Sequence, residues 1–240
     1  MSLEDAAASP APRPGAEHLD ALRKLDTCSV ANAIEATGVR LRNEGYMDAT
    51  VRCMFPELPP LVGYAMTLRV KSADPPVEGV PARERNDWWE AFVAIPEPRL
   101  LVIQGEPGDP ASGSVLGEVH AHIYRSLGCG GVVTDGAIRD LPALRALRMP
   151  LFAGHVAVSH AYAHVVEAGA PVKVGGLTIQ PGDLIHGDVH GVLRVPAEVA
   201  DRIPAIAARQ RARERQIIDY CGSPAFSLEG LRRLLGQPGD

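Results

Sequence analysis

GSVLGEVHAHIYRSLGCGGVVTDGAIRD, residues 113–140, is the stretch of this chain that decides the fold. Its amphipathic first half predicts a helix over 117–127, which glycines then break. The β-branched run 132–134 predicts a short buried strand, followed by a loop that leads to Arg139 and Asp140. In α/β folds, ligands usually bind in the loops beyond the carboxyl ends of the strands. The stretch therefore predicts a place where a guanidinium, carboxylates and helix-start amides meet.

Strands and helices alternate on both sides of this stretch. Strands are predicted at 63–70, 100–103 and 150–153, and helices at 83–95, with a stripe of Trp88, Trp89, Phe92 and Ile95, and at 141–147. Strand, helix and strand in succession favour parallel pairing with right-handed crossovers. We therefore expect an α/β fold with a central sheet flanked by helices.

The two ends of the chain have a different texture. Residues 1–17 are rich in Ala and Pro and predict a mobile N-terminal arm. Residues 171–195 read as successive short strands and turns, and no stretch has the composition of a linker. We therefore expect one domain over 18–240 with C-terminal helices from about 197. The remaining helices are predicted at 18–25, at 30–36 with Thr27 or Ser29 as cap and Gly38 as stop, and at 227–235.

Composition limits the partners. The chain has 240 residues, 46% hydrophobic and 22% charged, with a formal charge of −5. This balance is ordinary for a soluble globular protein and argues against broad electrostatic binding to nucleic acid or acidic membranes. No window approaches the roughly 18 apolar residues of a spanning helix. The N-terminus lacks the layout of a signal peptide, and the scattered cysteines form no CxxC pair, so we expect four free thiols and a cytoplasmic location.

Common catalytic motifs are missing, but the histidines form two groups. The sequence has no GxxxxGK[ST], GxSxG, HExxH or paired CxxC, and no GxGxxG after a strand. His160 and His164 would share a face if SHAYAH were helical, either as a metal pair or as histidines at a pocket rim or interface. A zinc site that joins them to His186 and His190 is conceivable, and His155 lies nearby in sequence. Local sequence leaves these alternatives open.

A sharper set of candidates is Glu118, Arg139 and Asp140. The helix-start amides of Val119 and His120 favour an anion, and Arg139 can bind the same carboxylate through two N–H groups. Asp140 can hold a divalent cation, with Glu118 contributing through a water. Alternatively, Arg139 and Glu118 form an ion pair and Asp140 caps the helix that follows it. Spacing alone does not separate the two interpretations.

The same residues carry a resemblance to a known family. Glu118, twenty intervening residues and Arg139-Asp140, inside GE…GVVTDGAIRDL and followed by LRALRMPLFA, resemble the class II pyruvate aldolases. Those enzymes act on 4-hydroxy-4-methyl-2-oxoglutarate and 4-carboxy-4-hydroxy-2-oxoadipate, and the regulator of ribonuclease activity A shares their RraA-like fold. The resemblance runs from about Leu25 to Pro196. It implies a compact swivelling β/β/α domain in homotrimers or homohexamers, with sites at subunit interfaces and Mg²⁺ or Mn²⁺ as cofactor.

The resemblance also implies residue roles. Arg139, with Gly117 and the amides of Val119 and His120, would bind the pyruvyl unit of a small 2-oxo acid. Asp140 would ligate the metal. Glu118 stands where those aldolases usually have Asp, and it would position a water for catalysis.

The implied function is a metal-dependent lyase that cleaves or decarboxylates a 2-oxo acid, such as 4-hydroxy-4-methyl-2-oxoglutarate or oxaloacetate, and releases pyruvate. HVAVSHAYAH replaces the Arg-rich segment common in the family, so recognition of the distal part of the substrate differs, and His160 and His164 would lie at the rim. The alternative from the same resemblance is a non-catalytic regulator that binds a ribonuclease or another protein partner.

Overall fold

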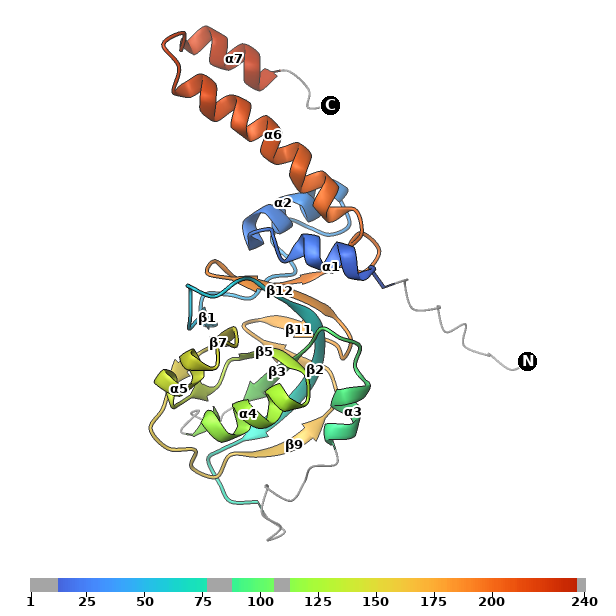
Figure 1. Ribbon diagram of the computed structural model, residues 1–240, viewed down its shortest axis with the longest axis vertical. Helices are drawn as coiled ribbons and strands as arrows, with labels where there is room; N and C mark the ends of the chain where they lie inside the picture. The colour runs from blue at the N-terminus through green and yellow to red at the C-terminus, as the bar shows by residue number, and fades with distance from the viewer. Residues whose placement is uncertain (1–12, 77–87, 106–112, 237–240) are drawn as a thin grey trace, which may run out of the picture.

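An eight-stranded mixed sheet forms the centre of the computed structural model, which describes residues 13–76, 88–105 and 113–236 (Figure 1). The strand order is β1-β7-β5-β3-β2-β12-β13, and β9 pairs with the second half of the long strand β2. The pairs β2–β3, β3–β5 and β5–β7 are parallel, which confirms the α/β prediction. The strands are β1 (Arg52–Cys53), β2 (Leu61–Lys71), β3 (Arg99–Gly105), β5 (Cys129–Thr134), β7 (Leu151–Ala153), β9 (His164–Ala168), β12 (Leu184–Asp188) and β13 (Gly191–Val195).

Both faces of this sheet are buried, and β3 shows how. Its apolar residues alternate, so Leu101 and Ile103 face one side while Leu100 and Val102 face the other. The first side is covered by helices and the second by the hairpin β10–β11, whose turn is Gly175-Gly176. A strand buried on both faces reads as a continuous hydrophobic run. The covering elements are α3 (Trp88–Ala94), α4 (Glu118–Ser126), α5 (Leu141–Ala146), β10 (Val172–Val174) and β11 (Leu177–Ile179).

A second, smaller sheet was not predicted. It consists of three short parallel strands in the order β4-β6-β8: β4 (Ser114–Leu116), β6 (Ala137–Ile138) and β8 (His155–Val156). Part of the predicted loop after β5 is therefore strand β6. Two- and three-residue strands are too short to show a period in sequence.

The two N-terminal helices and the first turns of the helix that begins at Ile203 pack together against β12 and β13. In Figure 1, α6 leads away from the sheet and α7 lies beside its far end. The cap of α2 is Asp26 and not Thr27 or Ser29, whereas Gly38 ends this helix in the left-handed conformation as predicted. α1 already starts inside the predicted arm, and 1–12 lie outside the described residues. The four helices are α1 (Ala16–Leu22), α2 (Thr27–Thr37), α6 (Ile203–Cys221), which begins later than the predicted 197, and α7 (Leu228–Gly236).

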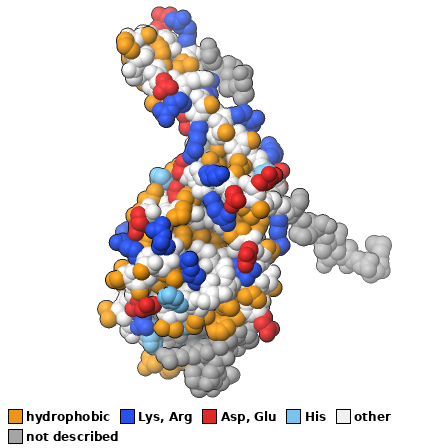
Figure 2. All heavy atoms as spheres, viewed as in Figure 1, with side chains coloured by type: hydrophobic (Ala, Val, Ile, Leu, Met, Phe, Trp, Pro, Cys, Tyr) orange, Lys and Arg blue, Asp and Glu red, His pale blue; other side chains and the backbone are white. Residues whose placement is uncertain are grey.

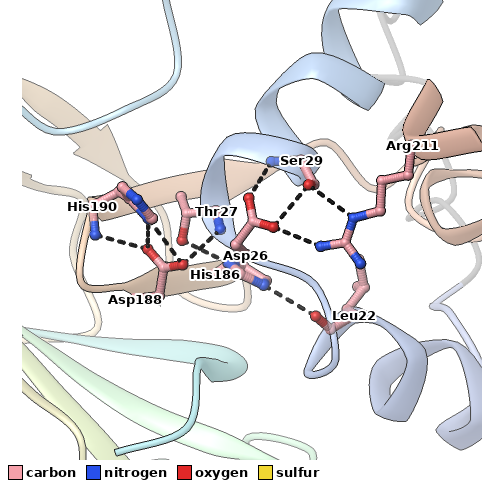
Figure 3. A network of polar contacts seen from close by, with 8 residues as sticks. All are labelled: Leu22, Asp26, Thr27, Ser29, His186, Asp188, His190 and Arg211. Carbon is pink, nitrogen blue, oxygen red and sulfur yellow. Dashed lines mark hydrogen bonds and ion pairs between the residues drawn. The ribbon is translucent and has the colours of Figure 1, made fainter. Parts of the chain in front are cut away.

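A polar network ties these helices to the sheet (Figure 3). Asp26 accepts a hydrogen bond from the Ser29 amide (2.7 Å) and pairs with Arg211 of α6 (2.6 Å). On the sheet side, Asp188 at the end of β12 accepts a hydrogen bond from the Thr27 amide (2.9 Å). The start of α2 is therefore anchored both to α6 and to β12.

On the face drawn in Figure 2, acidic and basic side chains are interspersed and do not form one large patch of a single sign. None of the described helices has the length and apolar character needed to span a bilayer. All four cysteines are free, as predicted.

Candidate functional site

The small sheet brings the two halves of the candidate site together. Residue pairing between β4 and β6 sets Leu116 beside Ile138, and the Arg139 amide donates to the Leu116 carbonyl (2.9 Å). The residues that follow these strands, Gly117 and Glu118 on one and Arg139 and Asp140 on the other, therefore emerge side by side. Parallel pairing thus makes neighbours of groups that are about twenty residues apart in the chain.

Asp140 lies at the start of α4. Its Oδ2 accepts a hydrogen bond from the Glu118 amide (3.0 Å) and lies 3.6 Å from Nε of Arg139. The residue has φ 58°, a left-handed conformation that Asp adopts more readily than most residues. Its side chain makes no capping hydrogen bond to α5. The alternative expectation therefore holds only in part: Asp140 is the N-cap residue of α5, but its side chain bonds to the start of α4, and Arg139 pairs with Asp140.

Gly117 permits this close approach. A Cβ at this position would lie 2.7 Å from Oδ2 of Asp140 and 3.0 Å from Nε of Arg139. The backbone of Gly117 is extended, with φ −135°, so any residue could adopt its conformation. Glycine is needed here because a side chain would push the carboxylate and the guanidinium away from the helix start.

A pocket of about 530 Å³ opens beside this helix start. Of the predicted substrate and rim residues, the pocket is lined by Gly117, Val119, His120, Arg139, His160 and His164. Glu118 and Asp140 are not among the described lining residues, and both are exposed. The Ala121 amide donates to the Gly117 carbonyl, which is the first hydrogen bond of α4. Val119 and His120 precede it, in the turn where a helix offers its amides no carbonyl acceptor. The pocket thus joins a permanent cation to the positive end of a helix.

The segment that carries His160 and His164 is not helical. It forms a turn before β9, which begins at His164, so the helical condition for a metal pair is not met. Nδ1 of His160 bonds to the Ala161 carbonyl (2.7 Å), and Nδ1 of His164 bonds to the Tyr162 carbonyl (2.6 Å). A carbonyl can only accept, so each Nδ1 is the donor and the neutral ring keeps its lone pair on Nε2. Both rings line the pocket as possible hydrogen-bond acceptors.

The hypothesis of a zinc site shared by the two histidine groups is wrong. His186 pairs across the sheet with Val62, and His164 pairs with Lys71 on the same strand. Nine residues separate those two partners, which is roughly 30 Å along a strand. His186 is fully buried between the Thr27 hydroxyl and the Leu22 carbonyl, and burial lowers its pKa, so it stays neutral (Figure 3).

Glu118 and Asp140, each the chain neighbour of a lining residue, suit a hard divalent cation better than zinc. Within the described parts of the chain, no group of three or more His, Cys, Asp or Glu side chains is placed to hold a metal ion. Mg²⁺ does not need such a cage, because it keeps several waters and binds through one or two carboxylates together with oxygens of the substrate. Asp140 and Glu118 meet that description: Asp140 is bonded to the Glu118 amide, and both side chains are exposed.

Other sequence candidates have structural roles. Cys129 is buried in β5, and its Sγ bonds to the Gly131 carbonyl (3.1 Å). Burial raises the pKa of this thiol to about 12, so it is protonated and inert, as expected for a buried cysteine. A Cβ on Gly131 would lie 2.6 Å from a Leu61 methyl group, so this glycine serves close strand packing.

Sequence reasoning missed the aromatic wall of the pocket. A stripe of apolar residues at helical spacing, such as Trp88, Trp89, Phe92 and Ile95, indicates core or interface packing. Trp88 does belong to the core, and both indoles also line the pocket together with Tyr124 of α4. The periodic pattern showed which helix face is buried but not that a cavity lies against it.

Comparison with known proteins gives a consistent result. A family model described as RraA-like, Aldolase/RraA, matches residues 27–194. A protein of Halalkalibacterium halodurans, provisionally named 4-hydroxy-4-methyl-2-oxoglutarate aldolase, is 32% identical over 127 residues, which cover 51% of this chain and 60% of that protein. The matched part is thus less than two thirds of that relative.

Two solved structures are similar to the fold. One is an uncharacterised protein of Pseudomonas syringae pv. tomato, with a TM-score of 0.73, 24% identity and coverage of 95% of this chain and 99% of the other. The second is RraAS2 of Streptomyces coelicolor, described as an unusual member of the RNase ES inhibitor RraA protein family. Its TM-score is 0.66 at 23% identity, and the match covers 86% of this chain and 98% of that one. At these identities the likeness concerns the fold alone.

Proposed function

The chain belongs to the RraA-like family, and on that premise we propose that it is a class II, divalent-metal-dependent lyase. It would cleave or decarboxylate a small 2-oxo acid, such as 4-hydroxy-4-methyl-2-oxoglutarate or oxaloacetate, and release pyruvate. The observation that carries this proposal is the convergence of Arg139, Asp140 and the first turn of α4, beside a pocket that Arg139, Val119 and His120 line. A cation, a carboxylate and a helix start at one site suit an anionic substrate and a divalent metal together.

Arg139 and α4 would bind the pyruvyl end. The guanidinium can donate two parallel N–H groups to the substrate carboxylate, and its planar shape fixes the orientation of that group. The amides of Val119 and His120 would donate to the same carboxylate from the positive end of the helix. Gly117 keeps the approach open, because any side chain there would collide with Arg139.

Asp140 would hold Mg²⁺ or Mn²⁺, with Glu118 contacting it through a water. When bound, the cation supplies Lewis-acid polarisation of the 2-oxo group. Glu118 would position a water that takes the proton of the C4 hydroxyl and returns a proton to C3 after the C3–C4 bond breaks. His160 and His164 would contact the distal part of the substrate from the pocket rim.

A Schiff-base route has little support. Such a route needs a desolvated lysine in the pocket, and the chain has only Lys24, Lys71 and Lys173. None of the three lines the pocket, and Lys71 lies 3.5 Å from the carboxylate of Asp74.

A second function deserves a direct test, namely a non-catalytic regulator that binds a ribonuclease or another protein. It is favoured by the fold shared with RraAS2, which is described as a member of an RNase inhibitor family.

Membership of the RraA-like family also leads us to propose that the chain forms a homotrimer or homohexamer. Sedimentation equilibrium would distinguish these two states.

Metal-dependent turnover decides between the two functions. Purified protein with Mg²⁺ or Mn²⁺ should release pyruvate from 4-hydroxy-4-methyl-2-oxoglutarate or oxaloacetate. The pyruvate is measured in an assay coupled to lactate dehydrogenase. The metal should also raise the melting temperature, and a chelator should reverse the rise. Asp140→Ala should lose both effects, whereas Asp201→Ala, which removes an exposed carboxylate in the turn before α6, should retain them. No pyruvate and no metal effect, together with a tight ribonuclease complex, would favour the regulator.

A further inference from the structure

Beyond Arg139, the walls of the pocket are apolar and aromatic. Trp88 and Tyr124 are 6% and 5% exposed, and their ring centroids lie 5.6 Å apart at an interplanar angle of 63°. The rings of Trp89 and Trp88 lie edge to face, with their centroids 6.3 Å apart. Val70 and Ile103 from the central sheet complete this wall. Because Trp88, Tyr124, Val70 and Ile103 belong to one core cluster, the wall is held in place by packing.

The same walls offer little to a second anion. Among the lining residues that the structure describes, Arg139 is the only one with a permanent positive charge, and none is Asp or Glu. The other described polar lining side chains, apart from the two tyrosines and the indoles, are Ser114 and the three imidazoles. If Arg139 binds the carboxylate of the 2-oxo acid, none of the other described lining residues offers a permanent cation to a second carboxylate. Burying an unpaired charge is costly, whereas burying an apolar group is favourable.

The size of the pocket also bears on the substrate. A volume of about 530 Å³ lies within the range of pockets that enclose whole small-molecule ligands, and it leaves space beyond a three-carbon pyruvyl unit. We propose that the preferred substrate is a 2-oxo acid whose distal substituent is an apolar, aliphatic or aromatic group. This inference rests on the proposed function, because it takes Arg139 and the start of α4 as the carboxylate end of the site.

The corresponding reaction is balanced without any further reactant. In a 4-hydroxy-2-oxo acid with an apolar group on C4, the C3–C4 bond breaks and its electron pair stays on C3. The C4 hydroxyl loses its proton and becomes the carbonyl of an apolar aldehyde. C3 takes up a proton, and the other product is pyruvate.

Intrinsic fluorescence tests the preference without turnover. The chain contains two tryptophans, and both line the pocket, so the whole indole signal reports on this site. In the presence of Mg²⁺, 5-methyl-2-oxohexanoate should change the emission and bind at least about tenfold more tightly than 2-oxoglutarate, in which a carboxylate replaces the isopropyl group. Tenfold corresponds to about 1.4 kcal/mol. Equal affinity, tighter binding of 2-oxoglutarate, or no signal with either acid overturns the inference.

A second cation in the wall should weaken or abolish the preference. Ile123→Arg places a guanidinium on α4, three residues after His120, and should reduce the ratio of the two affinities at least about tenfold. Tyr162→Arg, on a lining residue that is 55% exposed, makes the same test if Ile123→Arg does not fold. Val189→Arg is the matched control, since Val189 is 57% exposed and lies outside the lining, and its ratio should equal that of the wild type. An unchanged ratio in a folded pocket variant contradicts the proposal.

Turnover separates failure of this inference from failure of the proposed function. Cleavage of 4-hydroxy-2-oxo-4-phenylbutanoate should have a kcat/KM at least about tenfold above that of 4-hydroxy-4-methyl-2-oxoglutarate. A higher value for the dicarboxylic acid keeps the lyase and overturns the apolar preference. If neither acid yields pyruvate, the lyase is refuted, and the fluorescence comparison alone decides the chemistry of the pocket.

Discussion

Replacement of Gly117 by alanine would test whether the close contact between the two motif halves is needed for function. The new Cβ would lie 2.7 Å from Oδ2 of Asp140, so the carboxylate must retreat by roughly 0.7 Å to reach the 3.4 Å of an ordinary contact. That shift would lengthen the 3.0 Å hydrogen bond from the Glu118 amide to the limit of hydrogen bonding. Because Asp140 is exposed, water can replace the lost partner, and we expect a stability loss of only about 1 kcal/mol.

The expected effect on catalysis is larger. Arg139 would be displaced by the same methyl group, since its Nε lies 3.0 Å from the new Cβ. Misplacement of a binding or catalytic group by about 1 Å can lower a rate about 100-fold, and we expect a loss of that size in kcat/KM. The extended backbone at Gly117 accepts alanine, so the change isolates the side-chain contact from backbone strain.

Urea unfolding and pyruvate release measured on the same preparations would check both effects. Gly15→Ala is the matched control, because Gly15 is also a helix N-cap without a side-chain hydrogen bond, and its Cβ would meet nothing closer than 3.9 Å. The control should keep wild-type stability and activity. If Gly117→Ala keeps kcat/KM within about twofold of the wild type, the close contact is not required and the argument from geometry fails.

Two further predictions concern the rest of the molecule. Burial opposes ionisation of Asp26, but hydrogen bonds at the start of α2 and the ion pair with Arg211 lower its pKa to about 2. Because this value lies below the ordinary Asp pKa of 3.8, the charged form stabilises the fold above about pH 4, and this stability is lost as the pH falls from 4 toward 2. Asp26→Asn keeps a capping residue. It should therefore lower the free energy of unfolding in urea by about 1 kcal/mol at pH 7, after allowance for exposure of the ion pair, and by almost nothing at pH 2. An equal loss at both pH values would contradict this. In the native protein, a thiol reagent should react at the exposed Cys28 and Cys221, whereas Cys129 should react only after unfolding. Peptide mapping of the labelled protein checks this. Fast labelling of Cys129 in the native protein would contradict its burial.

The sequence predicted those parts of the fold that depend on local patterns. The helix expected over 117–127 is α4, and the strand expected at 132–134 is the end of β5, which begins at Cys129. Periodicity, glycine breaks and β-branched runs act within a few residues, so these elements can be read without knowledge of the rest of the chain. Parallel order in the middle of the sheet also followed from the alternation of strands and helices.

The geometry of the candidate site could be predicted only in part. The resemblance pointed to Arg139 and Asp140 together with the start of α4, and these groups do come together. The sequence did not show that Asp140 adopts a left-handed conformation and turns toward α4 instead of α5. A single residue with positive φ leaves no periodic pattern, because its conformation is determined by the contacts around it.

By itself, then, the sequence determined the α/β class and the buried strands, and it singled out Glu118, Arg139 and Asp140 as candidates for binding an anion and a metal. Tertiary structure alone decided that β4 pairs with β6, that the turn carrying His160 lines the pocket, and that Trp88 and Trp89 form part of its wall. The physical reason is range: helices and strands follow from neighbours along the chain, whereas a pocket is the space left between elements after distant segments have packed.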